Sequence, residues 1–221
     1  MRRILTGLMF IALVGAPVVH AAGFVFVATP LDNDDIALAE DLATDIPNCT
    51  AIGYWDETSQ SWSQHIAGLP LNNFAVETSM PFMASVSADG IWTLCGGVPD
   101  SSSYIDQYNI VPGFSTIMLP LNMTYYSNAD EVIQTISSCN VIAYWDAASQ
   151  SWSQHIQGLP LNNFAPRVGY PYMLSCTGSE TWPSTLPPAR IQPEEQEDVL
   201  MKMGTRNTFN LNSAPVQDTD R

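Results

Sequence analysis

Short apolar runs and one apolar stripe at helical spacing occur twice along the chain, in the same order. Residues 24–28 and 114–118 are rich in strand-forming side chains, and each run ends near a Pro-Leu pair. Apolar residues then recur at helical spacing over 35–43 and 129–136, with acidic residues near the start. Further strands are predicted at 51–56, 60–66, 81–85 and around Trp92. This order predicts an α+β, β-rich fold with one helix packed on four or five mostly antiparallel strands in each half.

The two halves are a tandem duplication with a constant offset of 90 residues (139 − 49 = 90). Residues 59–66 return unchanged as 149–156, and 68–75 return as 158–165. Between 23–92 and 113–182, 31 of the 70 paired positions are identical and no gap is needed. A period of this length corresponds to a complete small domain rather than to one turn of a solenoid. The chain is therefore expected to contain two homologous modules.

The first 21 residues resemble a secretory signal peptide. Arg2 and Arg3 precede a short apolar run, and Val19-His20-Ala21 has the pattern of a cleavage site. A membrane anchor is the alternative, but the run is short for a span and is broken by Gly15 and Pro17. We expect removal of the leader and no membrane insertion afterwards. The mature protein is then extracellular, on the cell surface or periplasmic, and the leader has a bacterial character.

Composition marks the other boundaries. Module 1 is expected over 22–100, a linker over 101–111 and module 2 over 112–188. Residues 189–221 are acidic and polar, and are expected to be mostly disordered apart from a short helix near 194–203. Modules of roughly 75 to 80 residues are small for an independent core, so a disulfide or packing against the twin would help.

Export favours disulfides among the four cysteines. Cys49 and Cys139 are equivalent positions, whereas Cys95 and Cys176 are not. The simplest hypothesis pairs cysteines within modules, Cys49 with Cys95 and Cys139 with Cys176, and the other pairings stay open. No two cysteines have a short metal-ligand spacing, so no metal site is expected.

The charge of the chain excludes two classes of partner. The net charge is −15, and residues 22–189 contain 16 acidic side chains and one basic one, Arg167. Such a surface repels nucleic acid and anionic lipid. A protein partner, self-association or a polysaccharide remains.

All six tryptophans fall into equivalent pairs. A turn at Thr58-Ser59 would place Trp55 opposite Trp62, and the duplication would likewise place Trp145 opposite Trp152. As core residues, tryptophans supply the apolar area that a small module needs. The alternative is that the strand tryptophans are exposed and stack on sugar rings, with two sites per chain gaining avidity.

His65 and His155 are the histidines that remain after removal of the leader. The nearest matched acids in sequence are Asp56 and Asp146, across the predicted hairpin. No serine stands in a nucleophile-elbow context, so a hydrogen-bonded strand histidine is the favoured interpretation. The acids Glu40 and Asp130 recur on the helices and are expected to be solvated.

Asparagine pairs follow Gly-Leu-Pro-Leu in both modules. They are Asn72 and Asn73 in the first copy and Asn162 and Asn163 in the second. Such side chains usually close turns, but their amides are also suited to a glycan.

These patterns favour a non-enzymatic surface or matrix protein that contacts other macromolecules, or itself, through its paired modules. A glycan-binding protein using the tryptophan hairpins is the first alternative. A hydrolase with a site between the modules is the second, although no pattern brings two carboxylates together. No cofactor motif is found.

Overall fold

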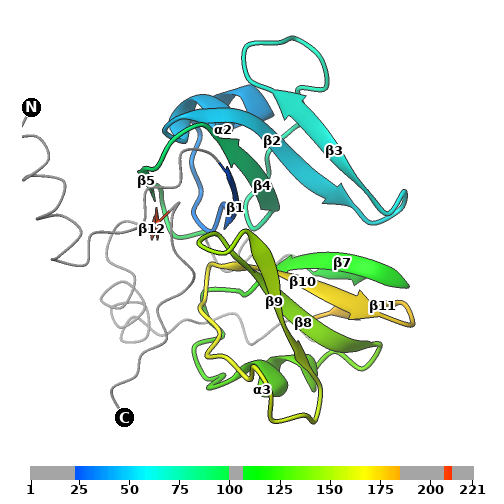
Figure 1. Ribbon diagram of the computed structural model, residues 1–221. Helices are drawn as coiled ribbons and strands as arrows, with labels where there is room; N and C mark the ends of the chain where they lie inside the picture. The colour runs from blue at the N-terminus through cyan, green and yellow to red at the C-terminus, as the bar shows by residue number, and fades with distance from the viewer. Residues whose placement is uncertain (1–22, 100–106, 185–206, 211–221) are drawn as a thin grey trace, which may run out of the picture.

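The computed structural model describes residues 23–99, 107–184 and 207–210 (Figure 1). The predicted signal peptide and the short helix predicted near 194–203 lie outside these residues.

Apart from β6 and β12, the described elements follow the same order in both halves of the chain. The first half contains β1 (Gly23–Ala28), α2 (Ala39–Asp45), β2 (Cys49–Asp56), β3 (Ser61–Ile66), β4 (Pro81–Val86) and β5 (Ile91–Leu94). The second contains β6 (Tyr108–Ile110), β7 (Gly113–Met118), α3 (Ala129–Ile133), β8 (Cys139–Asp146), β9 (Ser151–Ile156), β10 (Pro171–Cys176) and β11 (Glu180–Trp182). A last strand, β12 (Asn207–Asn210), lies within the predicted tail, and β6 lies within the predicted linker.

Two similar four-stranded antiparallel sheets form the body of the protein. Their strand orders are β1-β4-β2-β3 and β7-β10-β8-β9, and Figure 1 shows them as two separate halves. The β-rich, antiparallel part of the sequence prediction is therefore confirmed. Trp55 lies opposite Trp62, and Trp145 opposite Trp152, as the predicted turn position requires. The paired rings meet edge to face, with centroids 5.5 Å and 5.3 Å apart.

One face of each sheet belongs to a buried apolar cluster. In the first half, Leu42 of α2 is buried together with Ile52 and Phe82 of the sheet. The second cluster contains their equivalents, Val132, Ile142 and Tyr172. The apolar stripe seen in the sequence is therefore the buried side of each short helix.

The other faces of the two sheets meet each other at a nearly symmetric seam. The indole Nε1 of Trp55 donates to the carbonyl of Phe114, 2.9 Å away. Trp145 does the same to the carbonyl of Phe24 at 2.7 Å. Phe26 of β1 lies between the halves and meets Trp62 and Trp152 edge to face. The hairpin tryptophans therefore join the modules as well as pairing within them.

Two turn glutamines repeat this reciprocity. Gln60 bonds the backbone N–H and carbonyl of Phe114, and Gln150 bonds those of Phe24. Gly113 begins β7 with φ 104°, and a Cβ there would run into the Gln60 side chain. The glycine lets the Gln60 side chain approach the strand closely.

The disulfide hypothesis is confirmed for one module and wrong for the other. Cys139 and Cys176 are bonded, since they lie opposite each other on β8 and β10. Cys49 faces Val86 at the equivalent place, so it has no thiol to pair with there. Cys95 lies beyond the end of β5, and both Cys49 and Cys95 carry free thiols. A disulfide is consistent with an extracellular protein.

The two free thiols are expected to react very differently. Cys95 is exposed, whereas burial raises the pKa of Cys49 to about 11. Because the thiolate is the reactive form, native protein should take up one equivalent of iodoacetamide at Cys95. Peptide mass mapping checks this, with denatured protein taking up two equivalents as the control. Rapid labelling of Cys49 in the native state would contradict it.

None of the helices in the described part of the chain is long and apolar enough to cross a membrane.

Candidate functional site

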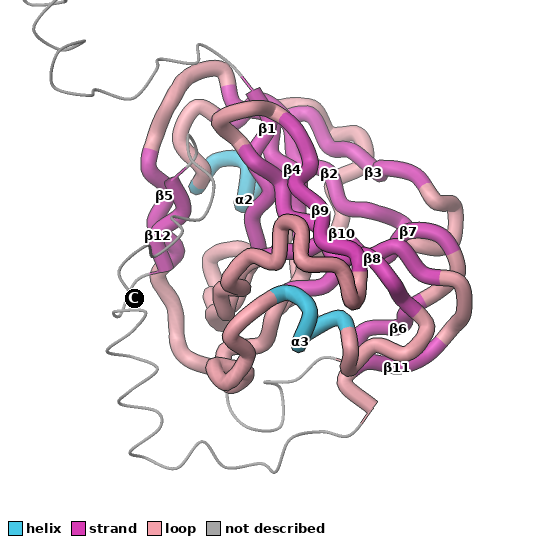
Figure 2. The backbone as a smooth tube through the Cα atoms, turned by 60° about the horizontal axis from the view of Figure 1, so that its bottom comes forward, coloured by secondary structure: helices cyan, strands magenta, loops and turns pink. Residues whose placement is uncertain are grey.

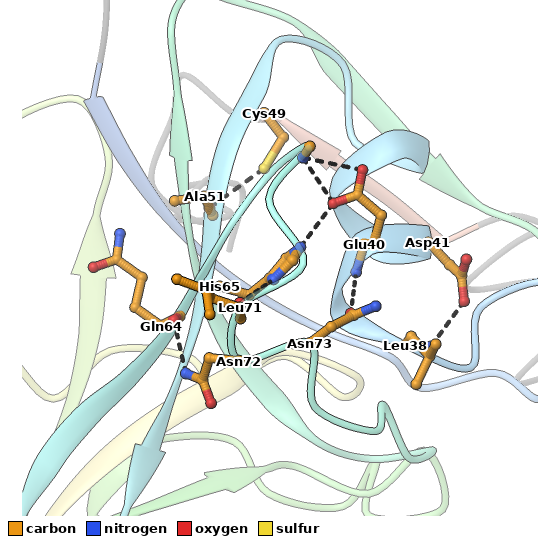
Figure 3. Close-up of polar contacts among 11 residues, drawn as sticks. Leu38, Glu40, Asp41, Cys49, Ala51, Gln64, His65, Leu71, Asn72 and Asn73 are labelled. Atoms are coloured by element: carbon orange, nitrogen blue, oxygen red, sulfur yellow. Dashed lines mark hydrogen bonds and ion pairs between the residues drawn. The ribbon is translucent and has the colours of Figure 1, made fainter.

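The segment that follows β3, residues 67–73, is tied to the body of module 1 by a buried histidine (Figure 3). His65 is fully buried. Its Nδ1 lies 3.0 Å from the carbonyl oxygen of Leu71, and its Nε2 lies 2.7 Å from a carboxylate oxygen of Glu40 on α2. Both neighbours are acceptors, so making both bonds at once requires a proton on each ring nitrogen. When both bonds are made, the ring carries a positive charge and links the helix to the loop.

Charge and hydrogen bonding shift both partners. The bond from His65, with help from the Gly68 N–H, lowers the pKa of Glu40. Burial by itself lowers the pKa of His65, but its bonds to Glu40 and Leu71 outweigh this, so the pKa is raised. Each shift favours the ionised form of its group, as expected for an ion pair.

Glu40 and the two asparagines complete the attachment of loop 67–73. The Gly68 N–H donates to both carboxylate oxygens of Glu40, at 3.1 Å and 2.9 Å. Asn72 has φ 55° and donates to the carbonyl of Gln64 at 2.7 Å. Asn73 accepts the backbone N–H of Glu40 at 2.9 Å, near the start of α2. The asparagines therefore have the turn-closing contacts that their sequence context indicates.

Module 2 builds the equivalent loop at residues 157–163, with an aspartate in place of the glutamate that contacts the histidine. His155 is fully buried and reaches the carbonyl of Leu161 and the carboxylate of Asp130, both at 3.0 Å. Asp130 also accepts the Gly158 N–H, and this bond, followed by that from His155, lowers its pKa. Asn162 has φ 51°, and Asn163 accepts the Asp130 N–H. Aspartate and glutamate thus play the same part in the two copies.

The two loops present apolar side chains to solvent. Leu71 is one of the most exposed large apolar side chains of the described residues, and the equivalent Leu161 is exposed to nearly the same fraction. The exposed fractions are 51% for Ile66, 47% for Leu69 and 74% for Leu71, and 42%, 46% and 73% for Ile156, Leu159 and Leu161. We call these two sets the leucine loops. Clustered exposed apolar residues usually mark a contact surface.

The acid partners of the histidines differ from those that sequence proximity suggested. Asp56 instead accepts the hydroxyl and N–H of Ser59 and the N–H of Thr58, which lowers its pKa and closes the β2–β3 turn. Glu40 is not simply solvated, because its carboxylate is bound to His65. The pairing joins residues 25 positions apart on a helix and a strand, so the sequence offered one signal only: an acid recurs at 40 and 130.

The hairpin tryptophans line a groove at the seam between the modules. Trp62, Trp145 and Trp152 border it, together with Phe24 and Met83, around a volume of about 370 Å³. Trp62 is 38% exposed, whereas Trp92 and Trp182 are buried in the cores. The strand tryptophans and the core tryptophans therefore occupy two different environments.

The described residues hold no group of three His, Cys, Asp or Glu side chains suited to a metal ion. Each histidine contacts one carboxylate and one backbone carbonyl, and the Ser59 hydroxyl donates to Asp56 rather than to a histidine. The candidate binding features are therefore the two leucine loops, whose backbones are fixed by hydrogen bonds, and the groove lined by tryptophans.

No protein-family model matches this chain, and neither a curated protein nor a solved structure matches it.

Proposed function

We propose that the protein is a non-enzymatic, exported binding protein whose two leucine loops dock onto an apolar protein surface. The observation that carries this proposal is that both modules hold an exposed leucine, Leu71 or Leu161, on a loop fixed by a buried histidine. The surface belongs to another protein or to a second copy of this chain, as expected for a surface or matrix component.

Preorganisation of the loops supports binding. A mobile loop would lose conformational freedom when it docks, and that loss weakens affinity. Here the bonds of His65, Glu40 and Asn72 fix the backbone before any partner arrives. Burying an exposed leucine side chain contributes about 1.5–3 kcal/mol. Because the loop backbone is already ordered, less of that free energy is lost in ordering the loop when it binds.

The duplication supports binding at two points. Each module is proposed to be an α+β unit with its helix packed on its sheet, and the seam contacts of Trp55 and Trp145 hold the two units together. Two equal loops on one body gain effective concentration when a partner meets both.

Replacing Leu71 and Leu161 together with aspartate is the test. Size-exclusion chromatography with light scattering would measure self-association, and pull-downs from native secretions would measure capture of a partner. We expect association by the natural chain, weaker association by either single variant and loss in the double variant. Because both side chains are exposed, the free energy of unfolding should change by about 0.5 kcal/mol or less.

Tyr125→Asp is the matched control, since Tyr125 is another strongly exposed large side chain, it lies outside the leucine loops, and the variant gains the same charge. It should associate like the natural chain. A natural chain that is strictly monomeric and captures nothing, or a double variant that associates normally, would refute the proposal.

A second candidate function, glycan binding, is supported by the aromatic groove. Trp62 and Trp152 offer ring surface beside the polar side chain of Gln64. The test is titration of intrinsic fluorescence with soluble glycans. A saturable shift that is lost when Trp62 and Trp152 are both changed to alanine, in a folded protein, would favour this candidate over protein docking.

A further inference from the structure

The two short outer strands β5 and β11 each pair with one further strand, but the partners come from different places in the chain. β11 pairs with β6, which directly precedes β7 in its own module. β5 pairs with β12, which lies 113 residues further along the chain (207 − 94 = 113). Figure 2 shows these two pairs in different parts of the molecule. The equivalent strands β5 and β11 therefore pair with segments that come from different parts of the chain.

The two pairings have the same register. Trp182 lies opposite Tyr108 and Thr181 opposite Asn109. The residues 90 positions earlier are Trp92 (182 − 90) and Ile91 (181 − 90), which lie opposite Phe209 and Asn210. Phe209 therefore takes the place of Tyr108, and Asn210 takes that of Asn109.

The sequences of the two partner strands agree at these places. β6 reads Tyr108-Asn109-Ile110, and the corresponding stretch reads Phe209-Asn210-Leu211: an aromatic residue, an asparagine and an aliphatic residue in both. In module 2, Ile110 is buried in the core and the Tyr108 ring stacks on Trp182. The tail has an aromatic residue and an asparagine, Phe209 and Asn210, at the matching register.

In module 2, the strand that pairs with β11 comes from the segment directly before β7. In module 1, the corresponding segment before β1 falls in the predicted signal peptide. Subtracting 90 from Tyr108–Ile110 gives residues 18–20, Val18-Val19-His20. These residues lie in the predicted signal peptide, so its cleavage would take away the stretch that precedes β1. The mature module would then keep β5 without a strand from its own N-terminal side.

We propose that the edge of β5 in module 1 is a strand-accepting site, and that its ligand is the C-terminal segment of the same chain, residues 207–210. The segment adds to β5 by backbone pairing, in the register that β6 has on β11. The 22 residues between Ser184 and Asn207 (207 − 184 − 1) can span roughly 70 Å when extended, so the tether allows donation within one chain. This proposal does not depend on the leucine loops.

Cross-linking in the full chain tests the register. Thr208 lies opposite Thr93, so cysteines at both places, with Cys95→Ser, should form a disulfide within one molecule. Trypsin cuts after Arg206, and the fragment 207–221 should then stay attached until a reductant is added. The matched control moves the tail cysteine to Ser213, on the same fragment but out of register, and should cross-link much less. Equal cross-linking of both variants, or links found only between copies, would overturn the proposal.

Hydrogen exchange followed by mass spectrometry gives a second test. Phe209→Pro removes a backbone N–H from β12, so exchange in β5 should become faster while exchange in β11 stays unchanged. Ser213→Pro is the control and should leave β5 protected. Unchanged protection of β5 in Phe209→Pro would overturn the proposal, and if that variant fails to fold, the cross-linked pair decides.

Discussion

His65→Ala is expected to lower the free energy of unfolding by about 2–4 kcal/mol, although His65 takes part in no reaction proposed for this protein. His65 is fully buried, so alanine leaves a cavity and deprives the Leu71 carbonyl of its donor. The exposed part of the Glu40 carboxylate can still be hydrated, which limits the loss. Urea denaturation followed by circular dichroism measures the change. His155→Ala should behave similarly, and the two losses should add because the sites are separate.

The same histidine predicts a pH dependence with a defined sign. The folded-state pKa of His65 is raised above 6.5, so its stabilisation is complete below that value and is lost as pH rises through the raised pKa. The folded-state pKa of Glu40 is lowered below 4.5, so its stabilisation is present above that value and is lost as pH falls through the lowered pKa. These two groups together favour a stability maximum between pH 4.5 and 6.5.

Asp56→Asn is the matched control for both effects. Asp56 is the acid that sequence proximity suggested as the partner of His65, but its bonds go to Thr58 and Ser59. The variant should lose about 1 kcal/mol or less and should keep the decline in stability above pH 6.5. His65→Gln retains one donor and should lie between the natural chain and His65→Ala, without that decline. A decline that persists in His65→Gln would contradict the role assigned to the ring.

Trp182→Ala is expected to have the largest effect, a loss of about 3–5 kcal/mol in the free energy of unfolding. Trp182 is 1% exposed and stacks on Tyr108, and its Nε1 donates to the Thr135 hydroxyl at 3.0 Å. Alanine removes the contacts of the ring and the bond to the loop after α3 at once. Thermal and urea denaturation of the natural chain and the variant measure the loss.

Trp62→Ala separates this core role from the role of the hairpin tryptophans. Trp62 is 38% exposed and contacts Trp55 and Phe26. Its replacement should cost about 1–2 kcal/mol, because less apolar area is lost from the buried state. Equal losses for Trp62→Ala and Trp182→Ala would mean that the two positions do not differ as their burial indicates.

Most of the strands and the register of the two tryptophan hairpins could be predicted from the sequence because side-chain alternation and turn residues act over short distances. Trp55 lies opposite Trp62 as the turn position required, and the apolar stripe around Leu42 is the buried side of α2. The disulfide between Cys139 and Cys176 could also be predicted from the sequence. The expected bond between Cys49 and Cys95 was not formed, because a cysteine needs a partner opposite it in the sheet, and Cys49 has Val86.

The sequence could not identify the contacts that cross from one element to another. Nothing in the local pattern joins Glu40 to His65 across 25 residues, or the Gln60 side chain to the backbone of Phe114 across 54 residues. Such pairs depend on how a helix lies on its sheet and how one module lies against the other. The exposure of Leu71 and Leu161 could likewise not be predicted, because a leucine in a sequence is expected to be buried.

By itself, the sequence determined the duplication, the succession of helix and strands along each repeat and the place of the hairpin turns, since these follow from periodicity and from residues near one another. Only the tertiary structure decided the partner of each buried histidine, the exposure of Leu71 and Leu161, and the pairing of β12 with β5. The physical reason is that these features are properties of surfaces brought together by folding. A pattern of residues along the chain limits which surfaces exist, but packing selects which of them meet.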